Sequence, residues 1–172
     1  MAGKKETFLP HFRAYRYISV FQVSQRQKFA QTLRHILEAM SAEASSQLWD
    51  RWLKIYWQNR ISRAPEPLEE AEVSDMTAWP LSLKDHFPEA VGFLGQSPRP
   101  QWLGIDIEQD IPKEFITLHT DATGEYLNLI LQTLRRGDDQ IKEVQKIFTE
   151  LLAAGLSEGI AKKIRDSLIA LE

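Results

Sequence analysis

The stretch SQLWDRWLKIYWQNRI, residues 46–61, carries the strongest periodic pattern in the chain. Its apolar positions recur at spacings of three and four, which is typical of one broad face of an amphipathic helix. They are Leu48, Trp49, Trp52, Leu53, Tyr56, Trp57 and Ile61. Ser45 or Ser46 is predicted to cap this helix, and Pro65 and Pro67 are predicted to stop it. The stretch therefore predicts an aromatic helix.

Helical periodicity continues on both sides of this stretch. We predict helices over residues 26–40, about 68–79 and 88–95, and a helix or helical turn after Pro10. In the C-terminal third, the first of three helices ends at Gly137, Asp138 or Asp139 caps the second, and Ser157 caps the third after a stop at Gly155. The short turns between them predict antiparallel packing. The predicted fold class is all-α, an irregular helical bundle or α-solenoid-like array of about seven to eight helices.

Residues 104–111 break this periodicity, because Ile105, Ile107 and Ile111 alternate with acidic residues. Alternation of this kind is typical of a strand. Since helices flank it on both sides, a single strand would have no partner. We predict an irregular segment or a short helix here, followed by a short helix over residues 112–119.

The length of 172 residues fits one domain or two small ones. The best candidate for a linker runs from Gly95 to Pro100 and separates an N-terminal helical part, residues 1–95, from a C-terminal helical part, residues 101–172. Neither part shows a full set of apolar faces alone. We therefore expect one continuous domain.

Composition excludes several classes of protein. The chain has no cysteine, so a disulfide scaffold, a thiolate zinc site and a cysteine nucleophile are ruled out. No apolar run reaches the roughly 18 residues of a membrane span. The first residues, MAGKKETFLPH, lack the apolar core of a signal peptide, which favours a cytoplasmic protein without membrane contact.

Charge is distributed unevenly along the chain. The net charge is +7 over residues 1–63, −10 over residues 64–125 and zero over residues 126–172. The basic and acidic segments can face each other inside one domain, or the basic segment can meet an acidic partner such as nucleic acid. The sequence pI of about 5.9 favours the first interpretation.

Motifs for chemistry are missing from the sequence. No glycine-rich phosphate loop and no GxSxG serine motif is present, and no two of the four histidines lie three or four residues apart. His86 lies beside Asp85 and near Glu89, and His119 lies near Asp121, but acidic neighbours of this kind are common in an acidic segment. We predict no catalytic residue, no metal site, no cofactor and no enzyme activity.

Tryptophan is the other candidate for function. Trp49, Trp52, Trp57, Trp79 and Trp102 could form a core or a binding surface. Aromatic residues at helical spacing are usually core, whereas stacking next to basic residues is how single-stranded nucleic acid is held. Because Arg51 and Lys54 lie off the aromatic face, the core interpretation is favoured.

Residues 47–100 show a recognisable order of motifs: YWxxR, a proline turn, a glutamate-rich start, Met-x-x-Trp, and Phe-Pro-Glu-Ala-Val. In this order the stretch resembles an uncharacterised helical domain found near the C-terminus of bacterial sirtuin-like and related antiphage defence proteins. The matching residues are Trp52, Tyr56, Trp57, Arg60, Pro65, Glu72, Met76, Trp79, Phe87, Pro88 and Val91. The resemblance implies an accessory or recognition module whose chemistry lies elsewhere.

Two functional hypotheses follow. The first is a non-catalytic interaction module in a bacterial antiphage defence protein or complex, whose partner is another protein, another domain of a longer chain or a second copy. Its structural or partner candidates are Trp52, Tyr56, Trp57, Arg60, Glu72, Trp79 and Phe87. Arg60 and Glu72 flank the proline turn, so we predict that they form a bridge between two helices. The alternative is nucleic-acid binding through the basic N-terminal third, with Arg13, Arg16, Arg51, Lys54 and Arg63 as the candidates.

Overall fold

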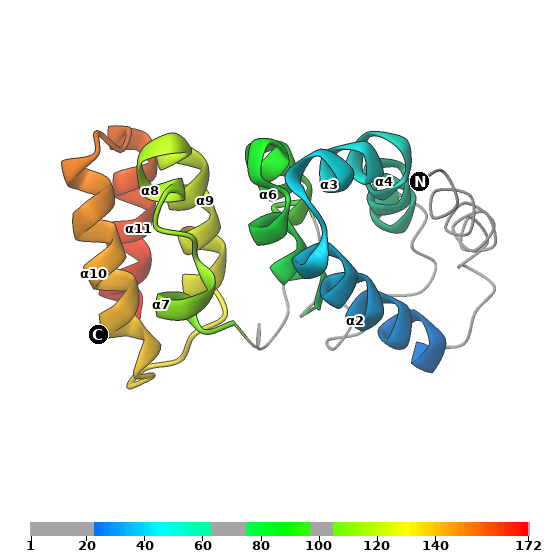
Figure 1. Cartoon of the computed structure of the whole chain (residues 1–172). Coiled ribbons are helices and arrows are strands. Elements are labelled where there is room, and N and C mark those ends of the chain that lie inside the picture. Colours follow the sequence, from blue (N-terminus) through cyan, green and yellow to red (C-terminus); the bar gives the residue numbers. More distant parts are fainter. Residues whose placement is uncertain (1–22, 63–74, 97–104, 172) are drawn as a thin grey trace.

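The computed structural model describes residues 23–62, 75–96 and 105–171, and within them every regular element is helical (Figure 1). The α-helices are α2 (Val23–Ala39), α3 (Ala42–Leu48), α4 (Lys54–Ser62), α6 (Phe87–Leu94), α7 (Ile107–Asp110), α8 (Phe115–Leu118), α9 (Thr120–Leu131), α10 (Gln140–Ala153) and α11 (Glu158–Leu171). A π-helical turn, η2 (Trp49–Leu53), joins α3 to α4, and two 3-10 turns, η3 (Trp79–Ser82) and η4 (Lys84–His86), precede α6. The predicted all-α fold is confirmed.

The aromatic helix begins earlier than predicted. Ser41 is its N-cap, because its extended backbone lets the Ser41 hydroxyl accept from the Ala44 N–H at 3.3 Å. Ser45 is buried inside α3, where its hydroxyl donates to the Ala42 carbonyl at 3.0 Å. The prediction of Ser45 or Ser46 as the cap is therefore wrong.

The elements on either side of the aromatic helix agree with the sequence patterns. Helix α2 buries Phe29, Leu33 and Leu37, which lie on the predicted apolar face. Helix α6 begins at Phe87, with Pro88 in its first turn. The alternating segment forms the short helix α7, capped by the Asp106 carboxylate, which accepts from the Gln109 N–H at 3.0 Å. The helix or helical turn predicted after Pro10 lies outside the described residues, and so does most of the helix predicted over residues 68–79.

The C-terminal helices α9, α10 and α11 run alternately in opposite directions, and α9 packs against both others (Figure 1). Gly155 follows α10 with a φ angle of 94°, the left-handed conformation in which glycine ends a helix, so the predicted stop there is confirmed. The predicted end of the first helix at Gly137 is wrong, because α9 ends at Leu131 and Gly137, with a φ angle of 80°, lies in the loop that follows. The Asp138 carboxylate accepts from the Gln140 N–H at 3.1 Å at the start of α10. Ser157 lies directly before α11, and its carbonyl accepts from the Ala161 N–H, so α11 begins where predicted.

Gly124 lets the backbone of α9 approach the turn between α10 and α11 closely. A Cβ atom at this position would lie 2.6 Å from Leu156 Cδ1 and 2.9 Å from Ile160 Cγ2. Overpacking of this kind costs about 1–3 kcal/mol, more than the roughly 0.5–1 kcal/mol that alanine gains over glycine in a helix. We expect Gly124→Ala to lower the free energy of unfolding, measured by urea titration.

Gly92 in α6 is the matched control for this substitution. A Cβ atom there meets nothing within 4 Å, so Gly92→Ala should leave stability unchanged or raise it by up to about 1 kcal/mol. Equal changes in the two variants would contradict the close approach of α9.

The two halves of the molecule meet where α6 lies next to α9 (Figure 1). The Phe87 ring lies 4.5 Å from the Phe115 ring and 5.7 Å from the Tyr126 ring, measured between centroids. The buried Tyr126 hydroxyl donates to the Thr77 carbonyl at 2.9 Å. One cluster of buried side chains includes residues of both halves. The expectation that they fold as one domain stays a prediction, which the first substitution in the Discussion tests.

Candidate functional site

The polar edge of the aromatic core gathers side chains from two separate segments. Trp49 begins η2 and Lys54 directly follows it, whereas Glu89 lies in the first turn of α6. The Trp49 indole Nε1 donates to Glu89 Oε2 at 2.7 Å, and the Lys54 ammonium donates to Glu89 Oε1. One carboxylate therefore ties the aromatic helix to α6.

His86 lies on the other side of Glu89, at the end of η4. Its Nδ1 is 3.9 Å from Glu89 Oε2, and its Nε2 is 4.0 Å from Asp50 Oδ1. The imidazole stacks on the Trp49 indole, with ring centroids 6.1 Å apart and planes inclined by 30°. Sequence proximity had indicated Asp85 and Glu89 as its neighbours. The structure places Glu89 and Asp50 against the ring, and Asp85 is exposed.

The hydrogen bond from Lys54 lowers the pKa of the Glu89 carboxyl below its ordinary value of 4.5, and the bond from Trp49 adds to this effect. A carboxyl with a lowered pKa stabilises the folded state fully above its unfolded pKa, and this stability is lost as the pH falls through the folded pKa. We therefore expect the wild-type protein to lose stability below about pH 4.5 more steeply than Glu89→Gln.

Urea titrations between pH 3 and pH 7 test this expectation. Lys54→Met is a second variant with the same expected direction, because it removes the main cause of the lowered pKa. Parallel losses of stability with falling pH in the wild type and in Glu89→Gln would show that the pair contributes nothing to acid sensitivity.

A second charged group lies at the C-terminal end of α2. Arg34 Nε donates to Glu38 Oε1 at 2.9 Å, and Arg34 Nη1 lies 4.0 Å from Asp75 Oδ1. Burial raises the pKa of the Asp75 carboxyl, and the Arg34 charge partly offsets this effect. These contacts hold α2 against the segment that leads into η3.

Comparison with protein families gives one match. Residues 15–167 match the family model described as a domain of unknown function (DUF4020). The chain belongs to the DUF4020 family. The predicted resemblance to an uncharacterised domain is confirmed to this extent. No curated protein and no solved structure gives a significant match to the chain.

The aromatic candidates of this DUF4020 domain divide into core and edge. Trp57, Trp79 and Phe87 are fully buried, and the Trp79 indole donates to the Ala30 carbonyl at 3.2 Å. Trp52 and Tyr56 are half-buried and pack against this core. The core interpretation therefore holds for Trp49, Trp57 and Trp79, whereas Trp52 lies at the edge of the core and Trp102 lies outside the described residues.

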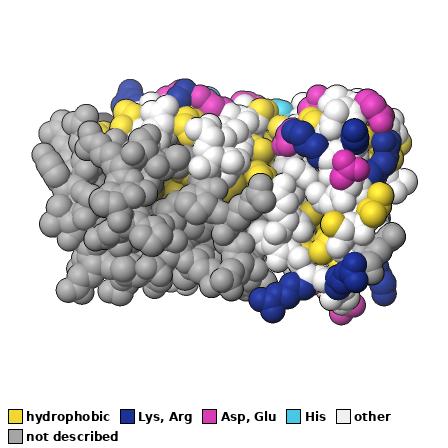
Figure 2. All heavy atoms as spheres, turned by 180° about the vertical axis from the view of Figure 1, so that it is seen from behind, with side chains coloured by type: hydrophobic (Ala, Val, Ile, Leu, Met, Phe, Trp, Pro, Cys, Tyr) yellow, Lys and Arg dark blue, Asp and Glu magenta, His cyan; other side chains and the backbone are white. Residues whose placement is uncertain are grey.

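The structure describes only two of the five basic candidates for nucleic-acid binding. Arg51 is exposed on η2, and Lys54 is engaged by Glu89. Arg13, Arg16 and Arg63 lie outside the described residues, and so does Glu72, the predicted partner of Arg60 in α4. On the described part of the face drawn in Figure 2, basic, acidic and hydrophobic side chains are interspersed.

His119 and the nearby Asp121 of the DUF4020 domain both have structural contacts. His119 packs against Phe87 and Phe115, with ring centroids 5.9 and 5.2 Å away. The Asp121 carboxylate, predicted near His119, accepts from the Ser157 N–H at 2.9 Å. Within the described ranges, no three His, Cys, Asp or Glu side chains group in a way that could hold a metal ion. The described helices are also too short or too polar to cross a membrane.

Proposed function

We propose that this DUF4020 domain is a non-catalytic helical interaction module of a cytoplasmic bacterial antiphage defence protein or complex. The order of motifs over residues 47–100 supports the defence context, because it resembles the helical domain near the C-terminus of such proteins. The partner is another protein or another domain of a longer chain. The chemistry of the system then lies in that partner.

The use of the polar side chains supports recognition over catalysis. The indole and the ammonium group at the candidate site both donate to Glu89, which joins two helices. An acid–base or nucleophilic mechanism needs a reactive group held free toward a substrate. At this site, the described donors hold the fold together.

Exposed leucines on two packed helices carry the proposal. Leu118 in α8 is 70% exposed, and α8 packs against α10, whose Leu152 is 41% exposed. Phe115 and Ile116 in the same helix are buried, so Leu118 is exposed on a helix that the core anchors. An apolar side chain on an anchored helix binds a partner at a lower cost in conformational entropy than one on a free segment. We assign the contact with the partner to Leu118 and Leu152.

Site-specific photo-cross-linking in the bacterium of origin tests this proposal. A photoreactive residue at position 118 should give a discrete cross-linked product with one protein, or with a second copy of the chain. The same residue at Gln145, which is exposed on α10, is the control and should give none. Absence of a discrete product at position 118, or the same products at both positions, would contradict the proposal.

A further inference from the structure

The Glu89 carboxylate is held by two donors of the kind that bind an external anion, with an imidazole beside them. The Trp49 indole and the Lys54 ammonium donate to its two oxygens, and the His86 imidazole lies 3.9 Å from Oε2. The indole N–H and the ammonium supply hydrogen bonds, and the ammonium adds positive charge. This donor set recognises a carboxylate.

A π-helical turn places two of these donors side by side. In a regular α-helix, residues five apart point about 140° away from each other around the axis. In η2 the Lys54 N–H donates to the Trp49 carbonyl, which is the i to i+5 bond of a π-helix. This turn brings Trp49 and Lys54 to the same side of the helix. π-Turns are rare and occur frequently at functional sites, so the alignment is an independent sign of a binding site.

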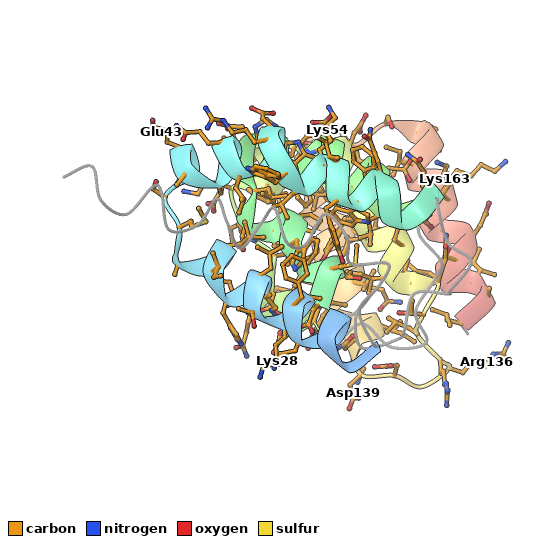
Figure 3. All side chains as sticks on the ribbon, turned by 90° about the vertical axis from the view of Figure 1, so that its right-hand side faces the viewer. Lys28, Glu43, Lys54, Arg136, Asp139 and Lys163 are labelled. Atoms are coloured by element: carbon orange, nitrogen blue, oxygen red, sulfur yellow. The ribbon has the colours of Figure 1, made fainter. Side chains whose placement is uncertain are left out.

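Solvent reaches the site from one side. The side chains of Lys54 and Glu89 are 38% and 39% exposed, and Lys54 lies on the outer edge of the helical path from α3 to α4 (Figure 3). Trp49 is fully buried, so its indole N–H reaches an anion only at the position of the Glu89 carboxylate. An external carboxylate can therefore approach Lys54 first and take over the contact with Trp49 when Glu89 swings out.

Neighbouring charges restrict the anion that fits. Asp50 Oδ1 lies 4.0 Å from His86 Nε2, on the side of the ring away from Glu89. A single carboxylate balances the Lys54 charge, whereas a dianion such as a phosphate would bring a second negative charge near Asp50. The site therefore suits an acidic side chain better than a phosphoryl group.

We propose that Trp49, Lys54 and His86 form a carboxylate-binding site, that Glu89 fills it as an internal ligand, and that an acidic side chain of the partner protein competes with Glu89 for it. The identity of the competitor as a partner's side chain rests on the proposed function. Because the internal ligand competes for the site, the external affinity equals the intrinsic affinity multiplied by the fraction of time that Glu89 leaves the site free. Displacement of Glu89 would also release the tie between the aromatic helix and α6.

Removal of the internal ligand gives the test. We expect Glu89→Ala to bind a short capped oligoglutamate peptide at least ten times more tightly than the wild type does, followed by tryptophan fluorescence at constant ionic strength. An oligoglutamine peptide should bind neither protein. Acetate should raise the melting temperature of Glu89→Ala more than chloride does, and the added substitution Trp49→Phe should abolish both effects.

Glu125→Ala is the matched control. Glu125 is 35% exposed and pairs with Lys163 at 2.7 Å on α11, so its removal also frees a lysine without freeing a tryptophan. If oligoglutamate binds the wild type, Glu89→Ala and Glu125→Ala equally, or binds none of them, the proposed site is wrong. If Glu89→Ala does not fold, Glu89→Ser, whose short side chain also leaves the site empty, serves for the same comparison. A negative result would leave the cross-linking expected at Leu118 unaffected, because Leu118 lies on α8 and takes no part in the contacts of Glu89.

Discussion

Replacing Phe87 with alanine is expected to lower the free energy of unfolding by about 3–5 kcal/mol. The Phe87 ring is fully buried where α6 meets the C-terminal helices, and it contacts Phe115, His119 and Tyr126. Its loss leaves a cavity at the junction between the two halves. The buried hydrogen bond from Tyr126 to Thr77 lies at the same junction and should weaken with it.

Two probes during urea unfolding show whether the halves stay coupled. Tryptophan fluorescence reports mainly on the N-terminal half, which holds four of the five tryptophans, whereas far-UV circular dichroism reports on helices of both halves. The two transitions should coincide in the wild type and separate in Phe87→Ala if the junction couples one domain. Phe93→Ala is the control, because Phe93 is half-buried and its ring contacts Trp49 and Trp57 within the N-terminal half. A smaller loss in Phe87→Ala than in Phe93→Ala would contradict the assigned role.

Trp57→Ala should cost a similar amount, about 3–5 kcal/mol. Trp57 is fully buried, and its ring centroid lies 5.6 Å from that of Trp79 and 6.2 Å from that of Trp49. Edge-on contacts between aromatic rings add about 0.5–1.5 kcal/mol to the burial of their area. Urea titration gives the loss of stability directly.

Trp52 provides the comparison for this substitution. It lies on the same helical path but is only half-buried, so Trp52→Ala should cost clearly less than Trp57→Ala. Equal costs would mean that the tryptophans do not divide into core and edge as the structure indicates. A large loss for Trp52→Ala alone would reverse the assignment.

Helices with strong local patterns could be predicted from the sequence. Helices α9, α10 and α11 have regular apolar faces, and Gly155 marks the end of α10, because a left-handed residue is a local requirement. Gly137 does not end α9, which stops at Leu131. At α7 the sequence predicts an irregular segment or a short helix, because neighbouring helices leave a strand without a partner. These features depend on a few consecutive residues.

The cap of the aromatic helix and its π-turn could not be predicted in this way. Three serines, Ser41, Ser45 and Ser46, could each cap the helix, and only the backbone conformation at Ser41 decides among them. The π-turn shifts the register after Trp49, and the contact that uses this shift is made with Glu89, 40 residues further along the chain. Such a contact depends on tertiary structure, and periodicity within one helix carries no sign of it.

The candidate site shows the same division. The acidic setting of His86 was visible from its neighbours in sequence, but Asp50, which faces its other nitrogen, comes from a different segment. The convergence of Trp49, Lys54 and His86 on one carboxylate likewise requires α6 to pack beside η2. The sequence indicated Lys54 only as a nucleic-acid candidate and Trp49 only as one of the tryptophans, and it did not predict that they meet at Glu89.

Protection against phage infection tests the central claim most directly. Bacteria that carry the complete gene should form fewer phage plaques than bacteria without it, and Leu118→Asp should remove this protection while the melting temperature of the protein stays within a few degrees. Leu118 is 70% exposed, so a charge there disturbs a partner contact and leaves the core intact. Protection that persists in Leu118→Asp, or a complete gene that gives none, would contradict the account.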